Sequence, residues 1–213
     1  MLELARFTAG HPEGYFEQVA ELNIRTIHHG VLPILGKRFL TRLYYELATS
    51  PQAGLWGVVE NGKVLGFVAG CADVRRSYIS VLSRAGIPLA GLALGAVFSA
   101  GFIRAVSAIV AYPFRGHRPV AVGGFTDTRD PQLLAIAVAE AAQGRGIGKM
   151  LVQALEQGFL SWGLTGRYRV ATNVEEIGSN AFYQKLGFAP CGRVRHHRLI
   201  LQMYEKEIPG SRA

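Results

Sequence analysis

A glycine-rich run between Gln143 and Gly148 constrains the fold of this chain more than any other feature. It follows the apolar stretch Leu133 to Ala139 and opens the amphipathic stretch Lys149 to Trp162. This succession predicts a strand, a tight turn and the start of a helix. The first turn of a helix presents free backbone N–H groups and the positive end of the helix dipole, and glycines let an anion approach the backbone closely. The run therefore predicts a binding loop for a phosphate or pyrophosphate.

Two well-known phosphate-binding patterns do not fit this run. A dinucleotide-binding fingerprint needs G-x-G-x-x-G, and Lys149 stands where its third glycine belongs. A Walker loop needs G-x-x-x-x-G-K-[ST], and here Gln143 and Met150 replace its first glycine and its hydroxyl residue. Both patterns are excluded because defining residues are missing.

A third pattern, [QR]-x-x-G-x-[GA], fits Gln143, Gly146 and Gly148. A second motif lies downstream, where Asn180 to Phe188 reads N-A-F-Y-Q-K-L-G-F. Its spacing predicts a short helix with Ser179 or Asn180 as the N-cap and Gly187 as the left-handed residue that ends it. With these two motifs in this order, the chain resembles the GCN5-related N-acetyltransferase (GNAT) superfamily, in which the first pattern is the acyl-CoA pyrophosphate loop.

The resemblance covers about residues 54–74 and 120–205 and implies an α/β fold. A central mixed, mostly antiparallel sheet would be splayed at the acyl-CoA site and flanked by helices on both faces. Local patterns agree with this fold, because an Asn61-Gly62 turn between two β-rich runs is the signal of a hairpin. We expect helices at 13–29 and 37–49, strands at 55–60, 63–73, 133–139 and 168–172, and completion of the sheet by 191–204.

The chain is expected to form a single acetyltransferase domain over residues 1–213, with an apolar, helical insertion at about 75–120. Residues 85–103 carry no charged side chain. We favour helices packed on the domain, covering the acceptor site or forming a homodimer contact. Membrane-surface contact through 85–111 stays open as an alternative. The glycines and alanines of the segment and Pro88 argue against the hypothesis of a transmembrane span.

The amino-acid composition limits which ligands the protein is expected to bind and in which cell compartment it is expected. The net charge of +8 suits a protein that binds coenzyme A, which carries several phosphates, and nucleic-acid-binding motifs are missing, so no nucleic acid is expected. Cys71 and Cys191 provide neither a disulfide framework nor a zinc site, so we expect no metal. The first six residues lack the basic and apolar regions of a secretory signal, which predicts a cytoplasmic location.

The resemblance implies acetyl-CoA as the co-substrate and assigns it to particular residues. The strand backbone from Ile136 through Ala137 to Val138 would pair with the pantetheine arm, and the Val138 N–H would meet the thioester carbonyl. The residues that would bind the pyrophosphate are Gln143, Gly144, Arg145, Gly146, Ile147, Gly148 and Lys149.

Three further residues complete the implied site. Asn180 would hydrogen-bond the pantetheine, although a helix cap is an alternative role for it, and Asn173 would reach the cofactor or else form a turn. Tyr183 is the one catalytic residue that the resemblance assigns, as the acid that protonates the departing thiolate.

No general base is assigned. Gln132 stands where some relatives place a glutamate, and it cannot take a proton. Glu140, Asp127, Asp130 and His117 are candidates without a predicted geometry.

The expected reaction is direct attack by a primary amine on acetyl-CoA in a ternary complex. The first fifty residues resemble bacterial members associated with surface-glycan synthesis, which favours a small-molecule acceptor such as an amino sugar or nucleotide sugar. Acetylation of a protein or peptide amine is an alternative, and so is a non-catalytic module that binds coenzyme A.

Overall fold

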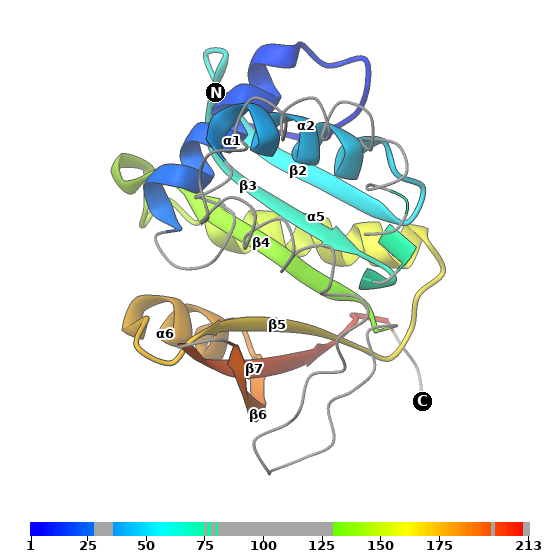
Figure 1. Cartoon of the computed structure of the whole chain (residues 1–213), viewed down its shortest axis with the longest axis vertical. Helices are drawn as coiled ribbons and strands as arrows, with labels where there is room; N and C mark the ends of the chain where they lie inside the picture. Colours follow the sequence, from blue (N-terminus) through cyan, green and yellow to red (C-terminus); the bar gives the residue numbers. More distant parts are fainter. Residues whose placement is uncertain (28–35, 75, 78–79, 81–129, 197–198, 211–213) are drawn as a thin grey trace, which may run out of the picture.

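The chain is built on one mixed sheet whose strand order is β1-β2-β3-β4-β5-β7-β6 (Figure 1). The computed structural model describes residues 1–27, 36–74, 76–77, 80, 130–196 and 199–210. The strands are β1 (Glu3–Phe7), β2 (Ala53–Glu60), β3 (Lys63–Cys71), β4 (Gln132–Val138), β5 (Arg167–Asn173), β6 (Ala189–His196) and β7 (Leu199–Glu207). The helices are α1 (Glu13–Thr26), α2 (Gly36–Thr49), α5 (Ile147–Ser161), α6 (Ile177–Lys185) and the short 3-10 helix η2 (Glu140–Ala142).

The sheet is splayed between β4 and β5. All other neighbouring strands are antiparallel, whereas β4 and β5 are parallel and share one register pair, Gln132 with Arg169. The Arg169 N–H donates to the Pro131 carbonyl at 3.0 Å, and the Arg169 side chain forms an ion pair with Asp130. Beyond this joined end the two strands diverge (Figure 1). The predicted mixed, mostly antiparallel and splayed sheet is confirmed.

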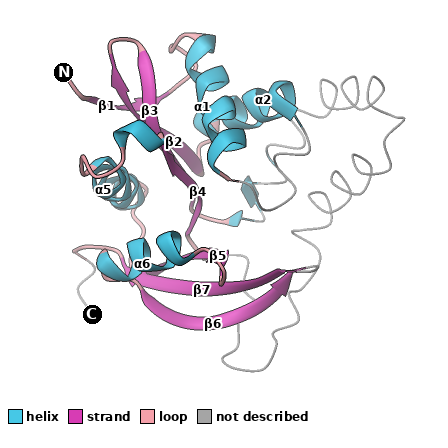
Figure 2. Ribbon diagram, turned by 90° about the vertical axis from the view of Figure 1, so that its left-hand side faces the viewer, coloured by secondary structure: helices cyan, strands magenta, loops and turns pink. Residues whose placement is uncertain are grey.

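Helices cover both faces of the sheet, as predicted. α1 and α2 pack on one face, and α5 lies on the other, while α6 lies against the β5–β7 part (Figure 2). α1 packs because Phe16, Val19, Ala20 and Asn23 recur at helical spacing and are all buried. On the opposite face Leu151, Leu155 and Phe159 give α5 its buried stripe. The splay between β4 and β5 therefore lies within a sheet that helices cover on both faces.

The β2–β3 hairpin forms at the predicted turn. Asn61 and Gly62 have φ of 51° and 74°, the left-handed values that a type I′ turn requires. The Gln18 side chain of α1 fixes the hairpin, because it accepts from the Val64 N–H at 2.8 Å and donates to the Gly62 carbonyl at 3.2 Å. The turn and the helix above it thus hold β3 in register with β4.

Several local predictions need correction. The first helix ends at Thr26 rather than at residue 29. The short helix after β5 begins at Ile177 with Glu176 as its N-cap, so the prediction of Ser179 or Asn180 as cap was wrong. Residues 191–204 were expected to complete the sheet, and they belong to two antiparallel strands, β6 and β7. The edge strand β1 was not predicted at all.

β4 is less buried than its apolar sequence suggested. Burial alternates along it, with Leu133, Ala135 and Ala137 buried and their neighbours half-buried. Successive side chains of a strand point to opposite faces of the sheet, so the face that carries Leu134, Ile136 and Val138 is the less covered one.

The predicted insertion at about 75–120 lies almost entirely outside the described residues, so its predicted helices, dimer contact and membrane contact are not described. Among the residues that are described, no helix is long and apolar enough to cross a membrane.

Candidate active site

Every second residue of β4 directs its backbone N–H and C=O groups into the splay. The Ala139 N–H donates to the Leu65 carbonyl of β3 at 2.8 Å, and Ala137 is in register with Phe67. In an antiparallel ladder alternate residues bond to the same neighbour, so Ala137 and Ala139 direct their backbone groups toward β3. Ile136 and Val138 therefore direct their N–H and C=O groups toward β5, into the splay. Of the three predicted strand residues, these two are placed to pair with an extended ligand.

The glycine-rich loop follows directly and delivers the chain into α5. Gly144 and Gly146 both have φ of 78°, a left-handed conformation that side chains with a Cβ rarely adopt. Gly146 is the N-cap of α5, and its carbonyl accepts the first helical bond from the Met150 N–H at 3.1 Å. The N–H groups of Ile147, Gly148 and Lys149 belong to the first turn, where a helix offers them no carbonyl. They are donors of the kind that binds an anion at a helix N-terminus, and they lie at the end of β4.

Charge at the loop is positive but partly neutralised within the chain. Lys149 is exposed in the first turn of α5. The Arg145 guanidinium donates to both carboxylate oxygens of Glu60, at 2.9 and 3.2 Å, and each partner is partly exposed. This pairing lowers the pKa of Glu60 and raises that of Arg145. Arg145 thus holds the loop against the end of β2, a contact that no local pattern around Glu60 had indicated.

Gln143 links the loop to the strand. Its side-chain amide donates to the Val138 carbonyl at 3.4 Å, the same residue whose N–H was predicted to meet the thioester. Gly148 in turn packs against α6, because a Cβ at this position would lie 2.8 Å from Cε2 of Phe182. The loop, β4 and α6 are therefore joined directly, and the predicted cofactor residues come together in one region.

Tyr183 lies in the core between α6 and the sheet. It is 5% exposed, and its ring contacts Phe182, Phe188 and Tyr204 at centroid distances of 5.3, 5.4 and 5.8 Å. Burial raises the pKa of its phenol above the ordinary value. The hydroxyl is therefore protonated at neutral pH, as a group that donates a proton to a departing thiolate must be.

Asn173 ends β5 with an unused donor. The residue is 5% exposed, and its Oδ1 accepts from the Glu175 N–H at 3.2 Å, which fixes the orientation of the amide. Among the described residues its Nδ2 has no hydrogen-bond partner. β4 and β5 run parallel from the Gln132–Arg169 pair, so Asn173 lies about level with Ile136 across the splay. The predicted contact with a bound cofactor has a donor available here.

Asn180 is engaged within the chain. Its Nδ2 donates to the carbonyls of Asn173 and Glu176 at 2.9 and 2.7 Å, and its Oδ1 accepts from the Tyr204 hydroxyl at 2.9 Å. These bonds hold the loop between β5 and α6. Contact of Asn180 with the pantetheine stays a prediction. The structure shows a different role for this side chain, which is to hydrogen-bond β5, the start of α6 and β7 to one another.

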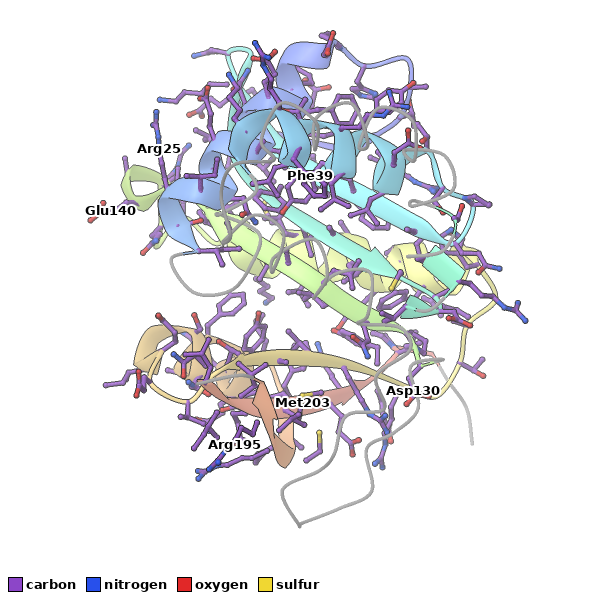
Figure 3. All side chains as sticks on the ribbon, in the orientation of Figure 1. Arg25, Phe39, Asp130, Glu140, Arg195 and Met203 are labelled. Atoms are coloured by element: carbon purple, nitrogen blue, oxygen red, sulfur yellow. The ribbon has the colours of Figure 1, made fainter. Side chains whose placement is uncertain are left out.

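The candidate bases lie apart from one another. Asp130 and Glu140 are at opposite ends of β4 (Figure 3). Asp130 is paired with Arg169, and Glu140 is exposed and extends outward. Asp127 and His117 lie outside the described residues. No group of three or more His, Cys, Asp or Glu side chains that could hold a metal occurs in the described part of the chain.

Comparison with protein families gives one match. Residues 99–188 match the model of the acetyltransferase (GNAT) family. The matched segment contains β4, the glycine-rich loop, α5, β5 and α6, and so includes every residue predicted to bind acetyl-CoA. No curated protein matches the chain in sequence.

Solved structures share the fold over nearly the whole chain. The ribosomal-protein-S18-alanine N-acetyltransferase from Escherichia coli has a TM-score of 0.59 at 12% identity, with coverage of 100% of this chain and 96% of that chain. A GNAT-family acetyltransferase from Streptococcus pneumoniae has a TM-score of 0.59 at 16% identity and covers 98% and 99%. Arabidopsis thaliana NAA60 in complex with acetyl-CoA has a TM-score of 0.58 at 10% identity and covers 99% and 100%. At these identities the likeness concerns the fold.

Proposed function

We propose that this chain, whose residues 99–188 match the model of the acetyltransferase (GNAT) family, is an acetyl-CoA-dependent acyltransferase that acetylates a primary amine of a small molecule. The main observation that supports acetyl-CoA as the acetyl donor is the direct succession of β4, the glycine-rich loop and the start of α5. This arrangement combines a helix N-terminus with a strand edge that no described strand pairs beyond Gln132, which suits a ligand with an extended amide arm and a pyrophosphate. The whole chain, 1–213, would act as one such domain.

The residues have separate roles in the proposal. Ile136 and Val138 offer backbone groups to the arm, and the Val138 N–H polarises the thioester carbonyl. The first-turn N–H groups of α5 bind the pyrophosphate, and Lys149 adds positive charge. Acetyl-CoA supplies the thioester. The amine nitrogen bonds to the thioester carbonyl carbon, the carbon–sulfur bond breaks, and Tyr183 gives its proton to the leaving sulfur. The amine nitrogen releases a proton to solvent, and the Tyr183 phenolate takes one back from solvent.

The acceptor in the proposal is an amino sugar, free or linked to a nucleotide. It is supported by the net charge of +8 and by exposed arginines such as Arg193 and Arg195 on β6, which suit an acceptor that carries phosphate. The main competitor is a protein or peptide amine, because the S18-alanine N-acetyltransferase shares the fold. A cytoplasmic location belongs to the same proposal, since Cys71 and Cys191 are both free thiols, as a reducing compartment allows.

Two measurements on the full chain test the proposal. Isothermal titration with acetyl-CoA first establishes binding. Thiol release is then followed against amino sugars, nucleotide amino sugars, polyamines and peptides with a free amino terminus. Fastest release with an amino sugar supports the proposal, and fastest release with a peptide moves the acceptor to the competing class. Tight binding with no release above hydrolysis for any amine would instead support a non-catalytic module.

A further inference from the structure

The hydroxyl of Tyr204 connects the last strand of the sheet to α6. Tyr204 lies on β7 and is 2% exposed. Its hydroxyl donates to Asn180 Oδ1 at 2.9 Å and accepts from Gln184 Nε2 at 3.5 Å. Asn180 and Gln184 are four residues apart on α6 and so lie on one face of that helix. One buried phenol therefore sets the rotation of α6 relative to β7.

The same network holds the start of α6. The Asn180 amide that accepts from Tyr204 also donates to the backbone carbonyls of Asn173 and Glu176. These carbonyls belong to the end of β5 and to the N-cap of α6. The network thus ties three elements, β5, α6 and β7, through the half-buried Asn180 and the buried Tyr204.

Tyr183 stands on the helix that this network fixes. It follows Asn180 by three residues, and its ring lies between Phe188, at 5.4 Å, and Tyr204, at 5.8 Å. A rotation of α6 about its axis would displace the Tyr183 hydroxyl, because this group lies at the far end of a long side chain. We propose that Tyr204 is a positioning residue, which acts through Asn180 and its own ring to hold the Tyr183 hydroxyl where it donates its proton. This inference rests on the proposed acid role of Tyr183.

A double-mutant cycle tests the proposal. Tyr204→Phe keeps the ring and removes the hydroxyl, and it is made alone and together with Tyr183→Phe. The kcat for thiol release is measured with the amine that gives the fastest release. Tyr44→Phe is the matched control, because Tyr44 is also buried, and its hydroxyl accepts from Asn23 Nδ2 at 2.6 Å between α1 and α2.

If Tyr204 acts through Tyr183, Tyr204→Phe lowers kcat about 10-fold when Tyr183 is present and by less than about 2-fold when Tyr183 is Phe, since misplacement matters only while the acid is there. The KM for acetyl-CoA changes little. Tyr44→Phe lowers thermal stability to a similar degree and changes kcat by less than about 2-fold in both backgrounds.

Two results overturn the inference separately from the proposed function. Equal losses in both backgrounds, or no loss in either, would show that Tyr204 has only a structural role. An unchanged kcat in Tyr183→Phe alone would overturn the acid role itself. If Tyr204→Phe does not fold, Asn180→Ala removes the same hydrogen bond from its less buried partner. The cycle of Asn180→Ala with Tyr183→Phe then tests whether the loss of kcat requires Tyr183.

Discussion

Replacement of Gly146 by alanine tests the role of the glycine-rich loop in binding, because it should change coenzyme A affinity more than it changes the stability of the fold. Gly146 has φ of 78° and ψ of 0°, and a Cβ added there would meet no heavy atom within 4 Å. The cost of Gly146→Ala is therefore conformational, about 1–2 kcal/mol for a left-handed residue. Reduced entropy of the unfolded chain offsets about 0.4–1 kcal/mol of it. We expect the free energy of unfolding to fall by about 1 kcal/mol, which lowers the Tm by about 2–4 °C for a chain of this size.

The binding effect should exceed the stability effect. A loop that relaxes to relieve strain at Gly146 changes the direction of the N–H groups of Ile147 and Gly148, and hydrogen bonds weaken steeply when they bend. We expect the Kd for coenzyme A, measured by isothermal titration at one fixed salt concentration, to rise about 10-fold, or about 1.4 kcal/mol.

Gly166→Ala is the matched control for this effect. Gly166 lies in the turn between α5 and β5, has φ of 85°, and also offers open space to a Cβ. Both variants should lose about the same stability, because both place alanine in the left-handed region. Unchanged coenzyme A binding in Gly146→Ala would refute the loop as the pyrophosphate site. Equal weakening in both variants would attribute the loss to general destabilisation.

Three further results are expected. Gly148→Ala brings a Cβ to 2.8 Å from the Phe182 ring and should lower the free energy of unfolding by about 1–3 kcal/mol, and Phe182→Leu in the same chain should recover part of it in denaturant titrations. Because burial raises the pKa of Tyr183 above 10.0, kcat should show no alkaline loss with a midpoint below that value, and a midpoint near pH 8 that vanishes in Tyr183→Phe would contradict this. Arg145 lowers the pKa of Glu60 below 4.5, so the pair adds stability above that pH and loses it as the pH falls through the lowered value. The stability difference between wild type and Glu60→Gln should therefore shrink on acidification from about pH 6 to about pH 3, and a constant difference would exclude this linkage.

Local patterns predicted the elements that depend on neighbours in sequence. The Asn61-Gly62 hairpin formed because those two residues tolerate the left-handed conformation. α5 formed between residues 147 and 161, close to its predicted bounds, because its apolar residues recur at helical spacing and Gly163 follows with φ of 71°. These features are encoded within windows of a few residues, which is the range that sequence patterns describe.

Contacts between distant segments were not predictable in this way. Arg145 and Glu60 are 85 positions apart, and nothing near either residue indicates the other. Asn180 has the chemistry of a cap, yet it lies inside α6, and its amide reaches back to carbonyls of the preceding loop. The capping prediction failed because α6 begins at Ile177, so Asn180 lies one turn inside the helix, where its amide donates to carbonyls instead of accepting from the first N–H groups. The pairing of Tyr204 with Asn180 likewise depends on how β7 returns beside β5.

The position of the proposed anion site depends on glycines that lie far from the loop in the sequence. A Cβ at Gly66 of β3 would lie 3.0 Å from Cγ2 of Ile147, and one at Gly70 would lie 2.4 Å from Cδ1 of Leu155. These two residues therefore let α5 pack directly on the backbone of β3. Since β3 is paired with β4, the depth of α5 on the sheet also sets how its first N–H groups stand relative to the end of β4. The loop supplies the donors, and the small residues of β3 bring them to the strand edge where an extended ligand would pair.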